Sequence, residues 1–323
     1  MILLTGGTGF LGQIVLHDLL ARGESVRMLV RDPSRVKAPS GVELAEGDVL
    51  DIGSLERAFE GVDRVIHSAA VVSFWPRRRE EMTRINVEGT SNMVDFAVDA
   101  GVKKFVHVSS IAALGRISGA PKIDENSKWI KSRLNSAYGR SKYLAELQVH
   151  RGVAEGLKAV ICNPGIIVGP GHWDSGSPKL FSTIYKGLKF YNPGKTGFVS
   201  VQDVSRGILA LMDSEYVAGE RFVLVGENMW YKDFFGLVAK ELGVKAPSFA
   251  PPRFLSSFAG RMSEFVGNVT NKEPLITKET TRSSRHVFNY DGSKITRSLG
   301  FEYTPMAQCI HDTAVQFLKE HGR

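Results

Sequence analysis

Cysteines, long apolar runs and dense clusters of one charge are all scarce in this sequence. With only Cys162 and Cys309 among 323 residues, a disulfide scaffold and a cysteine zinc site are both excluded, and a reducing, cytoplasmic compartment is expected. No uninterrupted apolar run reaches the roughly 18 residues of a membrane span, and the strand-like segment directly after Met1 makes a signal peptide unexpected. The net charge of +7 is scattered, and the densest basic run, Arg77 to Arg79, is followed at once by two glutamates. The pattern therefore predicts no nucleic-acid partner, and no cluster of His, Asp and Glu indicates a metal.

The first half of the chain alternates strand patterns with helix patterns. Short apolar runs predict strands at Ile2–Leu4, Ser25–Val30, Arg64–His67, Lys104–Ser109 and Lys158–Asn163. Helical spacing of apolar residues predicts helices at Gly12–Arg22, Leu55–Phe59, Glu80–Ala100 and Tyr138–Glu155. Strands that alternate with helices predict an α/β fold with a doubly wound parallel sheet, covered by helices on both faces.

A glycine-rich loop follows the first predicted strand and opens the first predicted helix. Gly7, Gly9 and Gly12 match the dinucleotide fingerprint of a Rossmann fold, in which the backbone closely approaches a pyrophosphate. The pyrophosphate lies at the helix N-terminus, where free N–H groups attract anions. A glycine-rich turn without a ligand is the alternative, but the strand–turn–helix context favours a bound cofactor.

After Gly171 the pattern is looser, and glycine and proline become frequent. Helix patterns remain near Pro178–Tyr191, Val204–Ser214, Lys232–Leu242, Pro252–Gly267 and Met306–His321, and short strand patterns near Val199–Val201 and Arg221–Val225. We expect a dinucleotide-binding domain over residues 1–170, with segments that return to it near 196–226. Residues 171–323 would form a smaller, mostly helical substrate-binding portion that is partly interleaved with it.

The end of the second predicted strand indicates which nucleotide binds. An acid there binds the ribose 2′-hydroxyl of NAD, whereas a basic residue accepts the 2′-phosphate of NADP. Asp32 has the spacing expected for NAD, but Arg31 precedes it, and Arg35 and Lys37 follow. Three cations around one carboxylate favour NADP(H) over NAD(H), although solvated turn residues would give the same pattern.

Two residues of a predicted helix, Tyr138 and Lys142, are four positions apart and share one face. A tyrosine with a pKa near 10 is a poor acid–base at neutral pH. A neighbouring ammonium is expected to lower that pKa, so that proton exchange with a substrate oxygen becomes feasible. Ser109 and Ser110 end a predicted strand at the sheet edge where ligands bind. One of them would orient a reacting carbonyl; an exposed helical pair and serines that cap backbone groups are the alternatives.

These segments together resemble the extended short-chain dehydrogenases/reductases of the NAD(P)-dependent epimerase/dehydratase superfamily, in particular the dihydroflavonol-4-reductase-like and 3β-hydroxysteroid-dehydrogenase-like branch. The motifs that carry the resemblance are Thr5–Gly12, Val30–Pro33, Gly47–Val49, His67–Ala70, Asn86–Thr90, Val108–Ser110, Tyr138–Lys142 and Asn163–Gly165. The resemblance implies Tyr138 as general acid–base, Lys142 as its partner, and Ser110 in preference to Ser109 as the third catalytic residue. It implies a cofactor site made of Gly6, Gly7, Gly9, Phe10, Leu11, Gly12, Arg31, Lys37, Asp48, Val49, Ala69, Ala70, Tyr138, Lys142, Pro164, Gly165 and Ile166.

The activity implied is NADPH-dependent reduction of a carbonyl, or the reverse oxidation, on a hydrophobic small molecule. Sugar 4,6-dehydratases of the superfamily carry an Asp–Glu pair after the strand-end hydroxyl residue, where this chain has Ala112 and Ala113. An NAD-dependent nucleotide-sugar epimerase and a non-catalytic cofactor-sensing protein are the alternatives. The substrate pocket would be lined by apolar residues that are otherwise core, namely Val71–Trp75, Ile111–Leu114, Trp173, Phe181 and Tyr185.

One further segment, Pro252–Gly267, has apolar residues on one helical face, with Arg253 and Arg261 beside them. Three interpretations are open: a helix packed in the core, which we favour, a lid over the substrate, and a helix on a membrane surface. Relatives in the family often pair through the helix that carries Tyr138 and Lys142, so the resemblance also implies a homodimer.

Overall fold

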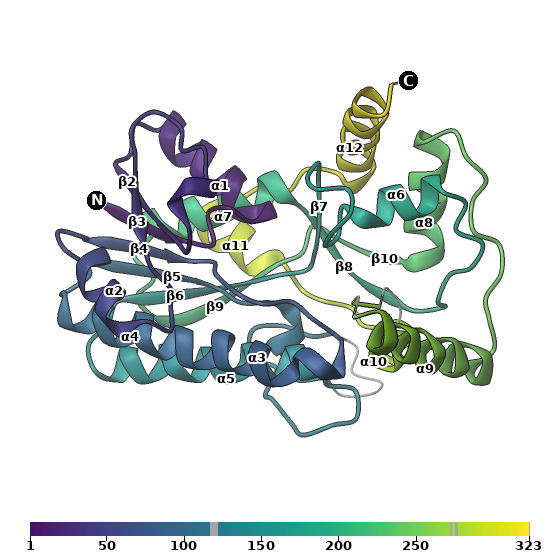
Figure 1. Cartoon of the computed structure of the whole chain (residues 1–323), viewed down its shortest axis with the longest axis horizontal. Coiled ribbons are helices and arrows are strands. Elements are labelled where there is room, and N and C mark those ends of the chain that lie inside the picture. Colours follow the sequence, from purple (N-terminus) through teal and green to yellow (C-terminus); the bar gives the residue numbers. More distant parts are fainter. Residues whose placement is uncertain (117–121, 272, 275–276, 323) are drawn as a thin grey trace.

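The computed structural model describes residues 1–116, 122–271, 273–274 and 277–322, and its larger part is built on a seven-stranded sheet (Figure 1). All neighbouring strands of this sheet are parallel. In spatial order they are β3 (Val42–Glu46), β2 (Val26–Val30), β1 (Ile2–Thr5), β4 (Arg64–His67), β5 (Lys104–Val108), β6 (Ala159–Pro164) and β9 (Ala218–Leu224). The central strands are continuous buried runs, because helices cover both of their faces.

Helices lie on both sides of the sheet (Figure 1). One face carries α1 (Phe10–Ala21), α7 (Val201–Asp213) and α11 (Ser293–Leu299), and the other carries α2 (Ile52–Ala58), α4 (Gly89–Asp99) and α5 (Ala137–Ala154). Each layer has its own apolar core, the first around Val15 and Ile208 and the second around Leu55 and Met93. The doubly wound α/β fold predicted from the sequence is confirmed.

The smaller part contains a three-stranded sheet of β10 (Glu227–Trp230), β8 (Lys195–Ser200) and β7 (Ile166–Val168). It packs with α6 (Lys179–Tyr185), α8 (Tyr231–Glu241) and α12 (Met306–Glu320) in a third core. Two more helices, α9 (Arg253–Thr270) and α10 (Lys278–Ser283), lie at the periphery (Figure 1). None of the helices in the described part of the chain is long and apolar enough to cross a membrane.

Three aromatic residues expected to line the substrate pocket pack inside this third core instead. The rings of Trp173 and Tyr185 lie 5.0 and 5.2 Å from that of Phe317 on α12, and Phe181 is 1% exposed. The packing supports the alternative that these residues belong to the core, because α12, which is distant in sequence, provides their apolar partner.

Two parts of the sheet domain also differ from the sequence prediction. The strand β3 was not predicted, because it lies at the sheet edge, is half-exposed and carries two glutamates. The helix predicted over Glu80–Ala100 is divided into α3 (Arg79–Thr83), a π-helical turn at Arg84–Glu88 and α4. Such turns are frequent at functional sites, and this one places the side chain of Asn86 in the interior.

The segment Pro252–Gly267 forms the helix expected of it, but the favoured interpretation as a core helix was wrong. Its large apolar residues are exposed; Phe254, for example, is 75% exposed and Phe265 is 62% exposed. The helix packs through its small and polar residues, so its apolar face points away from the protein.

Candidate active site

The order of the strands places a crevice at the carboxyl ends of β1 and β4. The chain passes from β1 outward to β2 and β3, and then returns to β4 on the other side of β1. Such a reversal is where doubly wound sheets bind ligands. Thr5 ends β1, and its hydroxyl contacts His67 Nδ1 at 2.8 Å and accepts the N–H of Ala69 at 3.1 Å. The two strand ends are thus tied together below the crevice.

The glycine loop lies at this crevice and has no room for side chains. Gly6 has a φ of +72°, and a Cβ on it would lie 2.7 Å from the backbone nitrogen of Ala69. A Cβ on Gly12 would lie 2.0 Å from the Gly6 carbonyl oxygen. The loop leads into α1 at Phe10 and Leu11, and the first turn of that helix contains no acidic residue. A bare backbone at a helix N-terminus without local negative charge fits the pyrophosphate of a dinucleotide.

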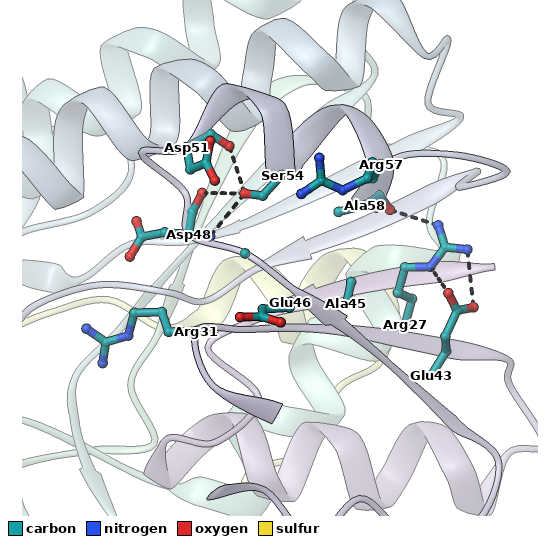
Figure 2. Close-up of a pocket in the computed structure, with 11 residues that line it drawn as sticks. Arg27, Arg31, Glu43, Ala45, Glu46, Asp48, Asp51, Ser54, Arg57 and Ala58 are labelled. Carbon is teal, nitrogen blue, oxygen red and sulfur yellow. Dashed lines mark hydrogen bonds and ion pairs between the residues drawn. The ribbon is translucent and has the colours of Figure 1, made fainter. Parts of the chain in front are cut away.

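A cavity of about 620 Å³ lies between α2 and the strands β2 and β3, and reaches the segments that follow these strands (Figure 2). It is lined by Arg27, Arg31, Glu43, Ala45, Glu46, Gly47, Asp48, Asp51, Ser54, Arg57 and Ala58. Arg31 and Asp48, both expected to contact the cofactor, are therefore brought together. Val49 is buried in the core beside this cavity, and Lys37 is an exposed residue outside its lining.

Some charged side chains in and next to this cavity form ion pairs, and others do not. Arg27 forms an ion pair with Glu43 at 2.7 Å. The carboxylate of Asp32 accepts the N–H of Ser34 and pairs with Arg35 at 2.9 Å, so it is engaged in its own turn. Within the described residues Arg31 has no ion-pair partner, and Figure 2 shows its side chain extended beside Asp48.

The phenol of Tyr138 lies at the carboxyl end of β5. Ser136 caps the N-terminus of α5 by accepting the N–H of Gly139 at 2.8 Å, so Tyr138 is on the first turn of the helix. The neighbouring hydroxyl of Ser110 lowers the pKa of Tyr138, but burial has the larger effect and raises it to about 12. The sequence predicted a lowered pKa, and the direction differs in this structure because the desolvation of the phenol outweighs the effect of Ser110.

The two strand-end serines point in different directions. The hydroxyl of Ser110 accepts the N–H of Ala112 at 3.1 Å and lies close enough to the phenol of Tyr138 to lower its pKa, whereas the hydroxyl of Ser109 donates to Glu146 at 2.5 Å. The geometry thus brings Ser110, and not Ser109, to the phenol.

Lys142 lies one turn further along α5 and is 2% exposed. Its ammonium donates to the carbonyl oxygen of Val108 at 2.8 Å. Burial lowers the pKa of Lys142 to about 8, and the carboxylate of Glu146 opposes this shift. Lys142 is therefore a cation at the carboxyl end of β5, where the carbonyl oxygen of Val108 and the nearby carboxylate of Glu146 stabilise its charge.

The carboxylate of Glu146 connects three elements below these residues and was not anticipated. It is 0% exposed, accepts the amide N–H of Asn163 at 2.6 Å, and pairs with Arg221 of β9 at 2.8 Å. Asn163 also donates to the Ser110 carbonyl oxygen at 3.0 Å. The only local signal was the spacing, since Tyr138, Lys142 and Glu146 repeat every four residues on one helix face.

The remaining predicted cofactor residues also lie at the carboxyl ends of the strands. Ala69 and Ala70 follow β4, and the side chain of Asn86 binds both the N–H and the C=O of the next residue, Val71, at 2.7 and 2.9 Å. Pro164, Gly165 and Ile166 follow Asn163 at the end of β6, where a Cβ on Gly165 would lie 2.6 Å from the Gly197 carbonyl oxygen.

One aromatic ring of the loop after β4 faces the phenol. Phe74 packs edge-on against Tyr138, with 5.8 Å between ring centroids. Of the other residues proposed to line a substrate pocket, Trp75 and Leu114 are buried. Phe74 is therefore the apolar neighbour that the structure brings to the reacting group.

Comparisons with known proteins agree with this geometry. The model of the NAD dependent epimerase/dehydratase family matches residues 2–225. A putative dihydroflavonol 4-reductase of Synechocystis sp. is 31% identical over 327 residues, which cover 98% of this chain and 94% of that protein. Sterol demethylase protein B of Methylococcus capsulatus is 33% identical over 340 residues, with coverages of 99% and 98%.

A solved structure extends the similarity to the three-dimensional level. The crystal structure of gox2253 superposes with a TM-score of 0.83 at 32% identity, and covers 100% of this chain and 99% of that one. The chain belongs to the NAD dependent epimerase/dehydratase family, and it is an NAD(P)-dependent enzyme of the extended short-chain dehydrogenase/reductase type.

Proposed function

We propose that this enzyme reduces a carbonyl group of a hydrophobic small molecule with NADPH, or catalyses the reverse oxidation. The observation that carries the proposal is the placement of Ser110 beside the phenol of Tyr138, whose pKa it lowers, with Lys142 on the same helix face. A hydrophobic substrate is supported by the ring of Phe74 against Tyr138, and by relatives named for dihydroflavonol and sterol chemistry.

In the proposed reaction, Ser110 and Tyr138 bind the carbonyl oxygen of the substrate. NADPH supplies the hydride that reduces the carbonyl carbon. Because burial holds the pKa of Tyr138 at about 12, the phenol is protonated at neutral pH and donates its proton as negative charge develops on the oxygen. The ammonium of Lys142 would stabilise the phenolate that remains.

For the cofactor, we propose that residues 1–170, with the segments that return near 196–226, bind the dinucleotide. The glycine loop and α1 would hold the pyrophosphate, Arg31 the 2′-phosphate with Lys37 nearby, and Asp48 and Val49 the adenine. Ala69, Ala70 and Lys142 would contact the nicotinamide ribose, and Pro164, Gly165 and Ile166 the nicotinamide ring. The two buried free thiols, Cys162 and Cys309, support a reducing, cytoplasmic site of action.

A calorimetric titration with NADPH and NADH tests the cofactor proposal. We expect NADPH to bind at least tenfold more tightly, about 1.4 kcal/mol, and Arg31→Ala to remove this preference while NADH affinity stays unchanged. Arg35→Ala is the matched control, because Arg35 is already paired with Asp32. Equal affinities in the wild type, or bound NAD that co-purifies with the protein, would contradict the proposal and favour a nucleotide-sugar epimerase.

The pH dependence tests the role of Lys142. Its pKa is lowered to about 8, so the ammonium is present at pH 7 and is lost as the pH rises through 8. We expect kcat/KM for carbonyl reduction to be level below neutral pH and to fall at higher pH with an apparent pKa near 8. Lys142→Arg keeps its charge and should remove this alkaline limb; an unchanged limb would assign the titration to another group.

A further inference from the structure

The helix α9 is amphipathic in the opposite sense to an ordinary surface helix. Its buried positions are small or polar, with Ser256, Gly260 and Gly267 against the protein. Its exposed positions include seven large apolar side chains at helical spacing, namely Phe254, Leu255, Phe258, Met262, Phe265, Val266 and Val269. A surface helix normally turns its apolar stripe to the core, so this face requires another partner.

The helix is held in this orientation by close backbone packing and polar contacts. A Cβ on Gly260 would lie 2.9 Å from the backbone nitrogen of Lys278, so only glycine allows α9 and α10 to approach this closely. Glu264 accepts the N–H of Lys278 at 2.8 Å, and Asn268 accepts the indole N–H of Trp75 at 2.9 Å. These contacts fix the polar side of α9 to the protein and leave the apolar side outside.

Charges around this helix are distributed unevenly. The acidic residues are turned toward the protein: Glu264 caps α10, and Glu279 accepts the N–H of Ala137 at 2.8 Å. Four exposed cations, Arg253 and Arg261 on α9 and Lys278 and Arg282 on α10, have no ion-pair partner within the described residues. An apolar face bordered by unpaired cations is complementary to a partner that has an apolar interior and anionic groups at its surface.

We propose that the apolar face of α9 binds the surface of a lipid bilayer with anionic headgroups. Interfacial helices combine aromatic and aliphatic residues on one face with Arg and Lys beside them, and anionic leaflets attract basic residues at short range. A second copy of the chain fits this face poorly, because a two-fold contact centred on α9 would bring the same unpaired cations of both copies together. The contact of Asn268 with Trp75, next to Phe74, places the bound surface beside the candidate active site.

Co-sedimentation with lipid vesicles tests this proposal. One set of vesicles contains phosphatidylcholine alone, and the other contains equal parts of phosphatidylcholine and phosphatidylglycerol. We expect the wild-type protein to sediment roughly tenfold more with the anionic vesicles, and this binding to weaken with added salt. The double variant Phe258→Gln with Phe265→Gln should lose it, and Arg253→Gln with Arg261→Gln should lose the preference for anionic lipid.

The controls distinguish lipid binding by the apolar face of α9 from non-specific binding and from self-association of the protein. Val315→Gln replaces an apolar residue on α12 that is 52% exposed, and this variant should bind vesicles like the wild type. All five exposed substitutions should leave the melting temperature and NADPH affinity unchanged, so the proposed function is tested separately. The proposal would be overturned if the wild-type protein did not bind vesicles, or if Val315→Gln reduced vesicle binding as much as the double phenylalanine variant. It would also be overturned if the wild type were a dimer that Phe258→Gln with Phe265→Gln converts to a monomer.

Discussion

Replacing Tyr138 with phenylalanine is expected to lower the rate of carbonyl reduction by about 10²–10⁴-fold, the range for loss of a positioned general acid. The variant lacks only the phenol hydroxyl beside Ser110. The ring contact with Phe74 is retained, and the glycine loop and the Arg31 cavity are untouched. NADPH affinity and thermal stability should therefore stay close to the wild-type values, while single-turnover reduction becomes slow.

A tyrosine on the same helix provides the control for this experiment. Tyr143 stacks on Trp129, with 4.6 Å between ring centroids, and Tyr143→Phe removes a hydroxyl without disturbing that contact. We expect near wild-type turnover in Tyr143→Phe. Equal losses in both variants, or full activity in Tyr138→Phe, would contradict the proposed proton donor.

Local spacing was sufficient to predict the parts of the site that are made by short stretches of chain. The sequence of the glycine loop predicts strand, turn and helix directly, and the need for Gly12 is local, because a Cβ on it would meet the backbone of Gly6. Tyr138 and Lys142 share a face in any helix. The strand that precedes Ser110 is buried throughout and ends where the sequence predicts, within one residue.

Features that depend on distant segments could not be predicted in this way. Arg221 reaches Glu146 across 75 positions, and neither residue shows this in its own neighbourhood. The exposed face of α9 resembles a core stripe in sequence, and only the packing of Gly260 against α10 shows which side is buried. The pKa of Tyr138 is likewise set mainly by burial, which a helical spacing does not reveal.

The buried carboxylate of Glu146 leads to the second large effect. Arg221→Met should destabilise the fold by about 3 kcal/mol, because a carboxylate that is 0% exposed loses the guanidinium with which it forms an ion pair. The bonds from Ser109 and Asn163 remain, which keeps the loss near the lower end of the range for breaking a buried pair. Urea unfolding should show a lower midpoint with an unchanged slope.

An exposed ion pair between α5 and α4 sets the comparison. Arg151 pairs with Asp95 at 2.6 Å, with both side chains more than a third exposed, so Arg151→Met should cost less than about 1 kcal/mol. The double variant Glu146→Gln with Arg221→Met removes both charges and should recover part of the stability lost in Arg221→Met, since the penalty comes from the unpaired carboxylate. If instead the two substitutions add, the ion pair is not the source of the loss, and Arg221 stabilises β9 through packing of its aliphatic stem.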